Sequence, residues 1–103
     1  MNCELELSEE KLIVNVIGKC CYDTWKDFRY SYLLEVDEQE VKTCEVNFAR
    51  TTFIDSSGLG GLLSLRKKLS LENNIVLSNT NKTIYGVLDI ANFAEFFTIK
   101  PSS

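Results

Sequence analysis

The order of strand-like and helix-like segments is the feature that most limits how this chain can fold. Leu5 and Leu7 alternate with polar neighbours, and Lys11–Ile17 is nearly continuous in β-branched and aliphatic residues before Gly18. These two segments predict an antiparallel hairpin around the turn at residues 8–10, with the second strand more deeply buried. Beyond them, helical spacing alternates with strand-like spacing. We expect helices over residues 22–38, from the Ser56-Ser57-Gly58 turn to about residue 71, and over residues 82–90, and strands over residues 41–48, 75–77 and 96–99.

The predicted order is therefore ββαβαβαβ, which is typical of the α/β fold class. Because helices join most of the strands, the strands should pair mainly in parallel within a mixed β-sheet, with the helices packed against it. The 103 residues contain no linker, repeat or low-complexity segment, so one domain over residues 1–103 is predicted.

Hydrophobic spacing predicts which helix faces are buried. In the first helix, Asp23 or Thr24 is a suitable N-cap, and an aromatic stripe should enter the core rather than form a ligand cage: Trp25, Phe28, Tyr32 and Val36. In the second helix, the predicted core stripe consists of Leu59, Leu62, Leu63 and Leu69. Arg66 falls inside that stripe without an explanation, and Leu65 at its edge should be partly exposed. The third helix should pack through Ile84, Val87, Leu88 and Ala91.

The composition argues against several classes of function. The chain has no histidine, which removes the general base of Ser-His-Asp and Cys-His sites, and no S-x-x-K spacing follows Ser56 or Ser57. We therefore expect no enzyme activity and no catalytic residue. Four cysteines without a C-x-x-C pair favour buried thiols in a reducing compartment, with no metal site and no cofactor.

Charge and hydropathy bear on the partners. The net charge of -4 argues against nucleic-acid binding, and the basic run of residues 66–68 sits late in a helix, where cations offset the helix dipole. No apolar run approaches the roughly 20 residues of a membrane span, so no membrane insertion is expected. The N-terminus lacks the order of a signal peptide, and a cytoplasmic location is the default expectation.

Residues 52–63 read as a strand, a turn and a helix start. Ser56 or Ser57 could cap the first turn of the helix. The glycines that follow, Gly58, Gly60 and Gly61, are costly in a helix, which indicates that a neighbouring element or a partner protein approaches this backbone closely. A phosphate-binding loop is disfavoured, because residue 63 is leucine where G-x-G-x-x-G needs glycine, and no G-K-[ST] follows.

The run Phe53-Ile54-Asp55-Ser56-Ser57-Gly58-Leu59-Gly60 resembles the signature of STAS domains, the family of bacterial anti-sigma factor antagonists. The resemblance covers nearly the whole chain and implies the STAS fold, with Gly18 at the end of the second strand. It makes Ser56 the phosphorylated serine beside Asp55. The implied partner-binding surface comprises Asp55, Ser56, Ser57, Gly58, Leu59 and Gly61, with Leu65 beside them.

The resemblance also implies a function and partners. The chain would be a protein-interaction switch that binds a partner while Ser56 is unmodified. A serine kinase of the anti-sigma factor (GHKL) type would weaken that binding, and a PP2C-type phosphatase would restore it. Residues 22–29, 77–79 and 90–93 are similar to the SypA-type, single-domain regulators of biofilm in vibrios, which favours biofilm or stress signalling.

Two departures from the family pattern bear on the identity of the partner. Residues 19–22 (Lys-Cys-Cys-Tyr) replace a common Leu-Asp pair, and Asn47 stands where aspartate is frequent. Two alternatives remain open beside the switch: an unphosphorylated adaptor, as in STAS-like subunits of lipid-transport ATPases, and a small-ligand sensor that holds a nucleotide or lipid near the same helix start.

Overall fold

Five strands form one mixed sheet in the order β1-β2-β3-β4-β5 in a computed structural model that describes residues 2–37, 40–69 and 75–102. The strands are β1 (Cys3–Ser8), β2 (Lys11–Cys20), β3 (Thr43–Ile54), β4 (Ile75–Thr80) and β5 (Thr98–Pro101). β1 pairs with β2 in antiparallel orientation, and the other three pairings are parallel. The hairpin, the mostly parallel sheet and the predicted order of elements are confirmed.

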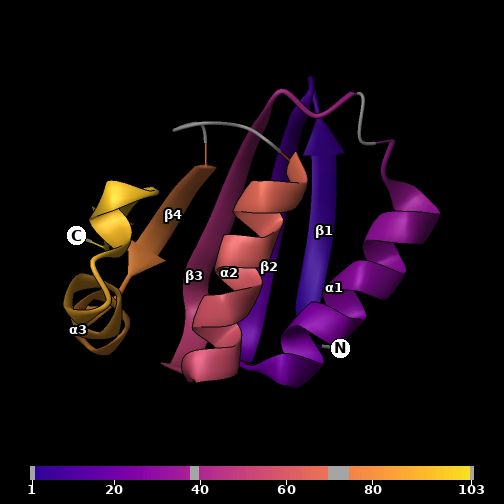
Figure 1. Cartoon of the computed structure of the whole chain (residues 1–103). Helices are drawn as coiled ribbons and strands as arrows, with labels where there is room; N and C mark the ends of the chain where they lie inside the picture. Colours follow the sequence, from indigo (N-terminus) through magenta and orange to yellow (C-terminus); the bar gives the residue numbers. More distant parts are fainter. Residues whose placement is uncertain (1, 38–39, 70–74, 103) are drawn as a thin grey trace.

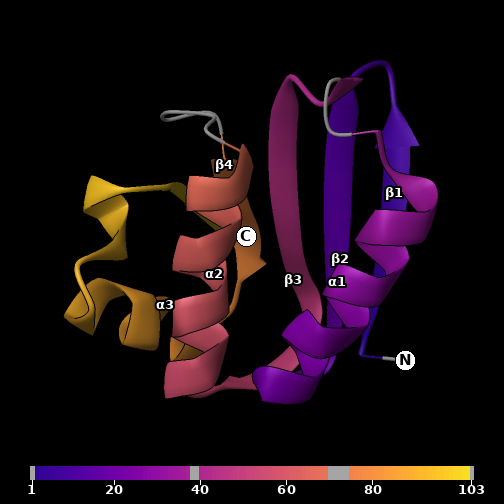
Figure 2. The ribbon, with the colours of Figure 1, turned by 45° about the vertical axis from the view of Figure 1, so that its right-hand side comes forward.

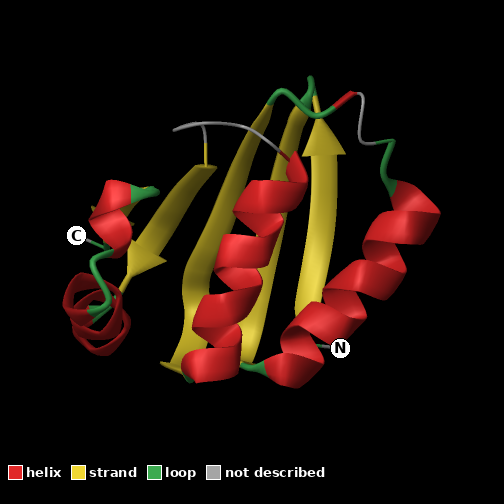
Figure 3. Cartoon of the chain, viewed as in Figure 1, coloured by secondary structure: helices red, strands yellow, loops and turns green. Residues whose placement is uncertain are grey.

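Three α-helices connect the parallel strands: α1 (Tyr22–Glu35), α2 (Ser56–Leu69) and α3 (Lys82–Ile90). α1 and α2 lie side by side over the same face of the sheet, and α3 lies beyond α2 toward β4 (Figures 1 and 2). A short 3₁₀ helix, η2 (Phe93–Glu95), leads from α3 into β5. Figure 3 shows the alternation of helix and strand along the chain. Among the described residues, no helix is both long and apolar enough to cross a bilayer.

The two faces of the sheet differ because the side chains of a strand alternate. On the helix side, β2 and β3 bury a row of apolar residues that includes Leu12, Val14, Val16, Val46 and Phe48. On the opposite face, four polar side chains form a hydrogen-bonded ladder across four strands. Its members, in order, are Glu6, Asn15, Asn47 and Asn79, joined at 2.7, 2.9 and 2.8 Å.

Asn47 is the centre of this ladder. Its amide group donates to Asn15 Oδ1, and its Oδ1 accepts from both Asn79 Nδ2 and the backbone N–H of Ala49. An amide can donate and accept at once, whereas an aspartate carboxylate only accepts. The residue that departs from the family pattern therefore lies on the face opposite the helices, away from Ser56.

The bounds of β2, β3 and β5 differ from those predicted from the sequence. Gly18 does not end β2: it adopts φ +75° at a register shift, and the strand continues through Lys19 to Cys20. β3 is also longer than the predicted 41–48, since it runs on to Ile54. β5 begins at Thr98, because η2 and the turn after it occupy the residues before Thr98. At its other end the strand includes Pro101.

Helix details bring further corrections. The N-cap of α1 is Cys21, and Thr24 is the third helical residue, whose Oγ1 accepts from the Cys21 backbone N–H at 3.1 Å. Phe28 and Tyr32 are buried as predicted, and Trp25 and Val36 are half-buried against the core. α1 ends at Glu35, earlier than the predicted residue 38, because Val36 is already in extended conformation. The predicted end of the second helix, Leu71, lies outside the described residues. α3 has the predicted bounds and buries Ile84 and Leu88.

In α2, Leu62 and Leu69 are buried as predicted and Leu59 is half-buried, but Leu65 takes the core position that was predicted for Leu63. Leu65 is 2% exposed and belongs to the core, whereas Leu63 is 41% exposed. Arg66, which the sequence left unexplained, extends over the Phe96 ring at 5.4 Å, and its Nε donates to the Phe96 carbonyl oxygen at 3.2 Å. Its charge therefore lies over the segment that precedes β5.

Candidate functional site

The predicted site lies where the C-terminal ends of β2 and β3 meet the N-terminus of α2. The backbone N–H of Asp55 donates to the Cys20 carbonyl oxygen at 3.2 Å, which joins the two strand ends. Asp55 then caps the helix, because its Oδ1 accepts from the backbone N–H of Gly58 at 2.8 Å. The expectation that a serine caps α2 was wrong: Ser56 and Ser57 are the first two helical residues.

Two of the three glycines allow neighbouring elements of the fold to approach closely. A Cβ atom on Gly58 would overlap the Cys20 carbonyl group, and a Cβ atom on Gly61 would overlap the indole ring of Trp25. A Cβ atom on Gly60 would have no neighbouring heavy atom within 4 Å. Gly58 and Gly61 are therefore explained by packing within the domain, and Gly60 is not.

Ser56 and Ser57 are both exposed, and they lie on different faces of α2. Helical spacing places Ser56 in line with Gly60 and Leu63, all of them exposed; we call these three residues the outer stripe of α2. Ser57 instead lines a groove between α1 and α2. Within the described part of the chain the hydroxyl of Ser56 makes no hydrogen bond, so the fold does not depend on it.

The predicted partner-binding residues differ in how far they are exposed. Asp55, Ser56 and Ser57 lie at or near the surface, and Leu59 and Gly61 are half-buried. Gly58 and Leu65 are buried, so neither presents a surface to a partner. Two exposed apolar residues near Ser56 were not in the predicted set: Leu63, which the sequence assigned to the core, and Phe53, which is 48% exposed. The spacing of Leu63 from Ser56, two helical turns, was the signal that could have found the former.

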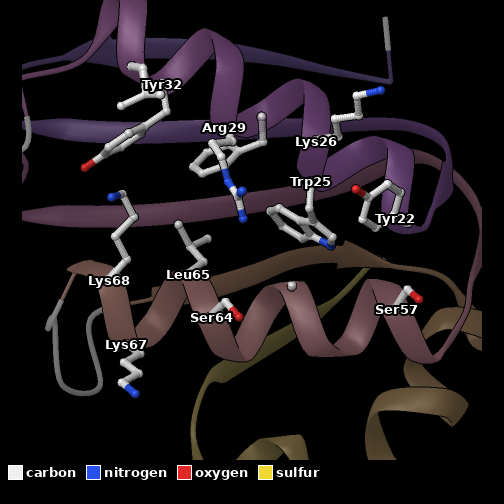
Figure 4. Close-up of a pocket in the computed structure, with 13 residues that line it drawn as sticks. Tyr22, Trp25, Lys26, Arg29, Tyr32, Ser57, Ser64, Leu65, Lys67 and Lys68 are labelled. Carbon is white, nitrogen blue, oxygen red and sulfur yellow. The ribbon is translucent and has the colours of Figure 1, made fainter.

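The groove between α1 and α2 has a volume of about 930 Å³, and we call it the α1–α2 groove. Trp25 and Tyr22 reach into it from α1, and Ser57, Ser64 and Leu65 face it from α2 (Figure 4). The Trp25 ring is held in place, because its Nε1 donates to the Gly58 carbonyl oxygen at 3.0 Å and its ring packs in a T-shaped arrangement with Phe28.

The cations of the groove have distinct orientations. Arg29 extends from α1 toward α2, and Lys68 extends from α2 toward the ring of Tyr32, with 5.2 Å from its Nζ to the ring centroid (Figure 4). Lys26 and Lys67 also border the groove, but they point away from it.

Buried thiols are the chemically notable groups close to the site. Burial raises the pKa of Cys20 to about 12, and the same cause raises the pKa of Cys44 to about 12 and that of Cys3 to about 11. At neutral pH these three thiols are protonated and poorly nucleophilic. The described residues contain no group of three or more His, Cys, Asp or Glu placed to hold a metal ion.

Comparison with known proteins identifies the domain. The STAS domain family matches residues 2–103. A STAS-domain containing protein of Pseudomonas aeruginosa (strain UCBPP-PA14) is 32% identical over 91 residues, which cover 87% of this chain and 88% of that protein.

Solved structures share the fold. The anti-sigma factor antagonist SpoIIAA in its unphosphorylated form superposes with a TM-score of 0.71 at 22% identity, covering 98% of this chain and 89% of that one. The Bacillus SpoIIAA in the phosphorylated form gives 0.69 at 22% identity, with 94% and 89% covered. A sulfate transporter family protein from Wolinella succinogenes gives 0.69 at 21% identity, with 87% and 73% covered. The chain belongs to the STAS domain family.

Proposed function

We propose that this domain is a non-enzymatic protein-interaction switch whose state is set by phosphorylation of Ser56. The observation that carries the proposal is the position of Ser56 at the exposed first residue of α2. Its hydroxyl has no capping role, because Asp55 fills that role. Phosphorylation would therefore alter the surface while leaving the interactions that fold the domain in place.

The electrostatics of the helix start are compatible with a phosphate. A phosphoserine adds roughly -1.5 to -2 charges at pH 7. The free N–H groups and the positive dipole end of a helix favour such a charge. Asp55 next to it repels the new charge and offsets part of that gain. The dianion would stand at one end of the outer stripe, where Gly60 lets a partner approach the helix backbone and Leu63 offers an apolar contact.

The partners in this proposal come from the family resemblance. A GHKL-type serine kinase would modify Ser56, a PP2C-type phosphatase would reverse the modification, and an unidentified downstream protein would bind the unmodified outer stripe. The phosphorylated form of SpoIIAA, which shares this fold, supports the idea that a STAS domain tolerates the modification. The pathway would be biofilm or stress signalling in the cytoplasm.

Site-localised mass spectrometry on the protein isolated from its native cells tests the proposal. We expect a sub-stoichiometric gain of about 80 Da, one phosphoryl group, on Ser56. Ser56→Ala should remove the gain, and Ser57→Ala is the matched control that should retain it. If the gain lies on Ser57 instead, or is absent in every growth condition, the switch at Ser56 is refuted.

The second test concerns binding. A partner captured with Ser56→Ala should bind Ser56→Asp far more weakly. A loss of about 3 kcal/mol of binding free energy lowers the affinity roughly a hundredfold. Equal capture by both variants would contradict the switch. A stable complex with a transporter subunit would instead favour the adaptor function, which the fold match to a sulfate transporter family protein keeps as the second candidate.

A further inference from the structure

The α1–α2 groove is a second surface with its own chemistry, distinct from the outer stripe that carries Ser56. Its floor is apolar, since Leu65 and Phe28 are buried beneath it and Trp25 forms part of its wall. The apolar residues at the two ends of its α1 side are exposed to solvent: Tyr22 is 68% exposed and Leu33 is 71% exposed. Exposed apolar side chains at both ends of a mainly apolar groove are typical of a docking site.

The charges around the groove have one sign. Four of the chain's 11 Lys and Arg residues line it, and none of the described Asp and Glu residues does, although the chain as a whole carries a net charge of -4. Arg29 makes no ion pair in the part of the chain that the structure describes. Lys68 contacts the face of Tyr32 and no carboxylate there. The groove is thus a cationic surface on an acidic protein, and it is complementary to an anionic occupant.

The shape of the groove favours a chain segment over a compact ligand. Its lining extends from Tyr22 to Leu33 on α1 and from Ser57 to Lys68 on α2, or about 17 Å along each helix at 1.5 Å of rise per residue. Both long sides are helices, α1 and α2 (Figure 4), and the groove is partly open to solvent. Small-molecule sites enclose most of their ligand, whereas an amphipathic helix fits along an open apolar groove of this length.

We propose that the α1–α2 groove docks an acidic amphipathic helix of a partner protein. Apolar side chains of that helix would pack on Trp25 and Leu65, and its carboxylates would pair with Arg29 and Lys68. Arg and aromatic residues are enriched in protein interfaces, which fits the residues gathered here. The proposal does not depend on the phosphorylation of Ser56, because it concerns another face of α2.

Trp25 provides a built-in reporter, because it is the only tryptophan of the chain and lies in the groove. The probe is a Trp-free helical peptide of about 14 residues, long enough to fill the groove, with leucine at i, i+3, i+4 and i+7 and glutamate elsewhere. We expect a saturable shift of Trp25 emission with a Kd on the order of 10 µM, weakening as salt is added. A peptide with lysine in place of glutamate should not bind.

Variants of the protein locate the binding. The double variant Arg29→Glu with Lys68→Glu should weaken binding at least about tenfold, and Ser64→Phe, which fills the groove without changing charge, should do the same. Arg50→Glu is the matched control, because Arg50 is exposed on β3 outside the groove, and it should leave the Kd unchanged. Circular dichroism confirms that each variant is folded.

Several outcomes would overturn the proposal. They are no emission shift at about 1 mM peptide, equal binding of the lysine peptide, or an unchanged Kd in both groove variants. Two others would assign the groove to a different occupant. Saturable binding of decanoate in the absence of peptide binding would make it a site for a small amphiphile. Self-association that the double variant abolishes would make it an interface between two copies of this chain.

Discussion

The indole Nε1 of Trp25 donates a hydrogen bond of 3.0 Å to the carbonyl oxygen of Gly58, and this contact joins α1 to the first turn of α2. Gly61, one turn later, has no side chain to keep the indole away. The helix start that carries Ser56 is therefore held from two sides, by Trp25 and by the end of β2 at Cys20.

Trp25→Phe should lower the free energy of unfolding by about 1–2 kcal/mol, because it removes this hydrogen bond and part of the packing on Phe28. Denaturant unfolding followed by circular dichroism measures the change without tryptophan emission. Tyr22→Phe is the control: Tyr22 is 68% exposed, and the change should stay within about 0.5 kcal/mol. Equal effects of the two substitutions would contradict the role assigned to the indole.

Asp55→Ala should cost about 1 kcal/mol of stability, since Asp55 is the residue that caps α2. Ser56→Ala should change stability by less than about 0.5 kcal/mol, because its hydroxyl has no hydrogen bond among the described residues. Thermal and denaturant unfolding of the two variants give the comparison. A larger loss of stability in Ser56→Ala than in Asp55→Ala would mean that Ser56, and not Asp55, caps α2.

The glycines of α2 should respond to alanine in opposite directions. Gly60→Ala should stabilise the domain by about 0.5–1 kcal/mol, because alanine is the better helix former and open space surrounds Gly60. Gly61→Ala should destabilise it and displace Trp25, which a red shift of the tryptophan emission would reveal. If Gly60→Ala stabilises the domain yet abolishes partner binding, a partner contacts that backbone. A loss of stability in Gly60→Ala would contradict the open surroundings.

Glu45 should contribute to the loss of stability in acid. Its pKa is lowered from the ordinary value of 4.5 by hydrogen bonds from Lys11 and from Ser78, whose Oγ donates to Oε2 at 2.6 Å. A carboxyl with a depressed folded pKa adds stability above its unfolded pKa and loses it as the pH falls through the folded value. The pair with Lys11 is partly exposed, so the contribution should not exceed about 1 kcal/mol.

Unfolding of Glu45→Gln across the acid range measures this contribution. The variant should be less stable than the parent above pH 4.5, and the difference should shrink below it. A difference that stays constant with pH would mean that the ion pair is not its source.

Cys21 should be the first cysteine to react with a thiol reagent in the folded protein. Cys3, Cys20 and Cys44 are buried with raised pKa values, whereas Cys21 is half-buried at the start of α1. Intact-mass analysis after brief iodoacetamide treatment at pH 8 should show one adduct, and Cys21→Ser should remove it. Rapid labelling of Cys20 would contradict its burial beneath the start of α2.

Local patterns in the sequence determined the order of the elements and the site segment. Alternation in β1 and helical spacing in α1 and α3 predicted the elements correctly, because these patterns reflect how side chains alternate on a strand or recur along a helix. The run of residues 53–60 located the strand-to-helix turn through its serine and glycine residues and its resemblance to the STAS signature. Whether a leucine faces inward depends in addition on the rotation of its helix about its axis, which the sequence did not determine.

Tertiary packing decided the rest. Rotation of α2 placed Leu65 in the core and Leu63 at the surface, because Gly58 fits against the Cys20 carbonyl and Gly61 against Trp25. Arg66 donates its hydrogen bond to the carbonyl oxygen of Phe96, which lies 30 residues later in the sequence. The α1–α2 groove joins side chains that lie about 35 residues apart in the sequence, and no local pattern records that they meet. Contacts of that separation depend on how helices settle on the sheet, and this is set by close packing of the whole core.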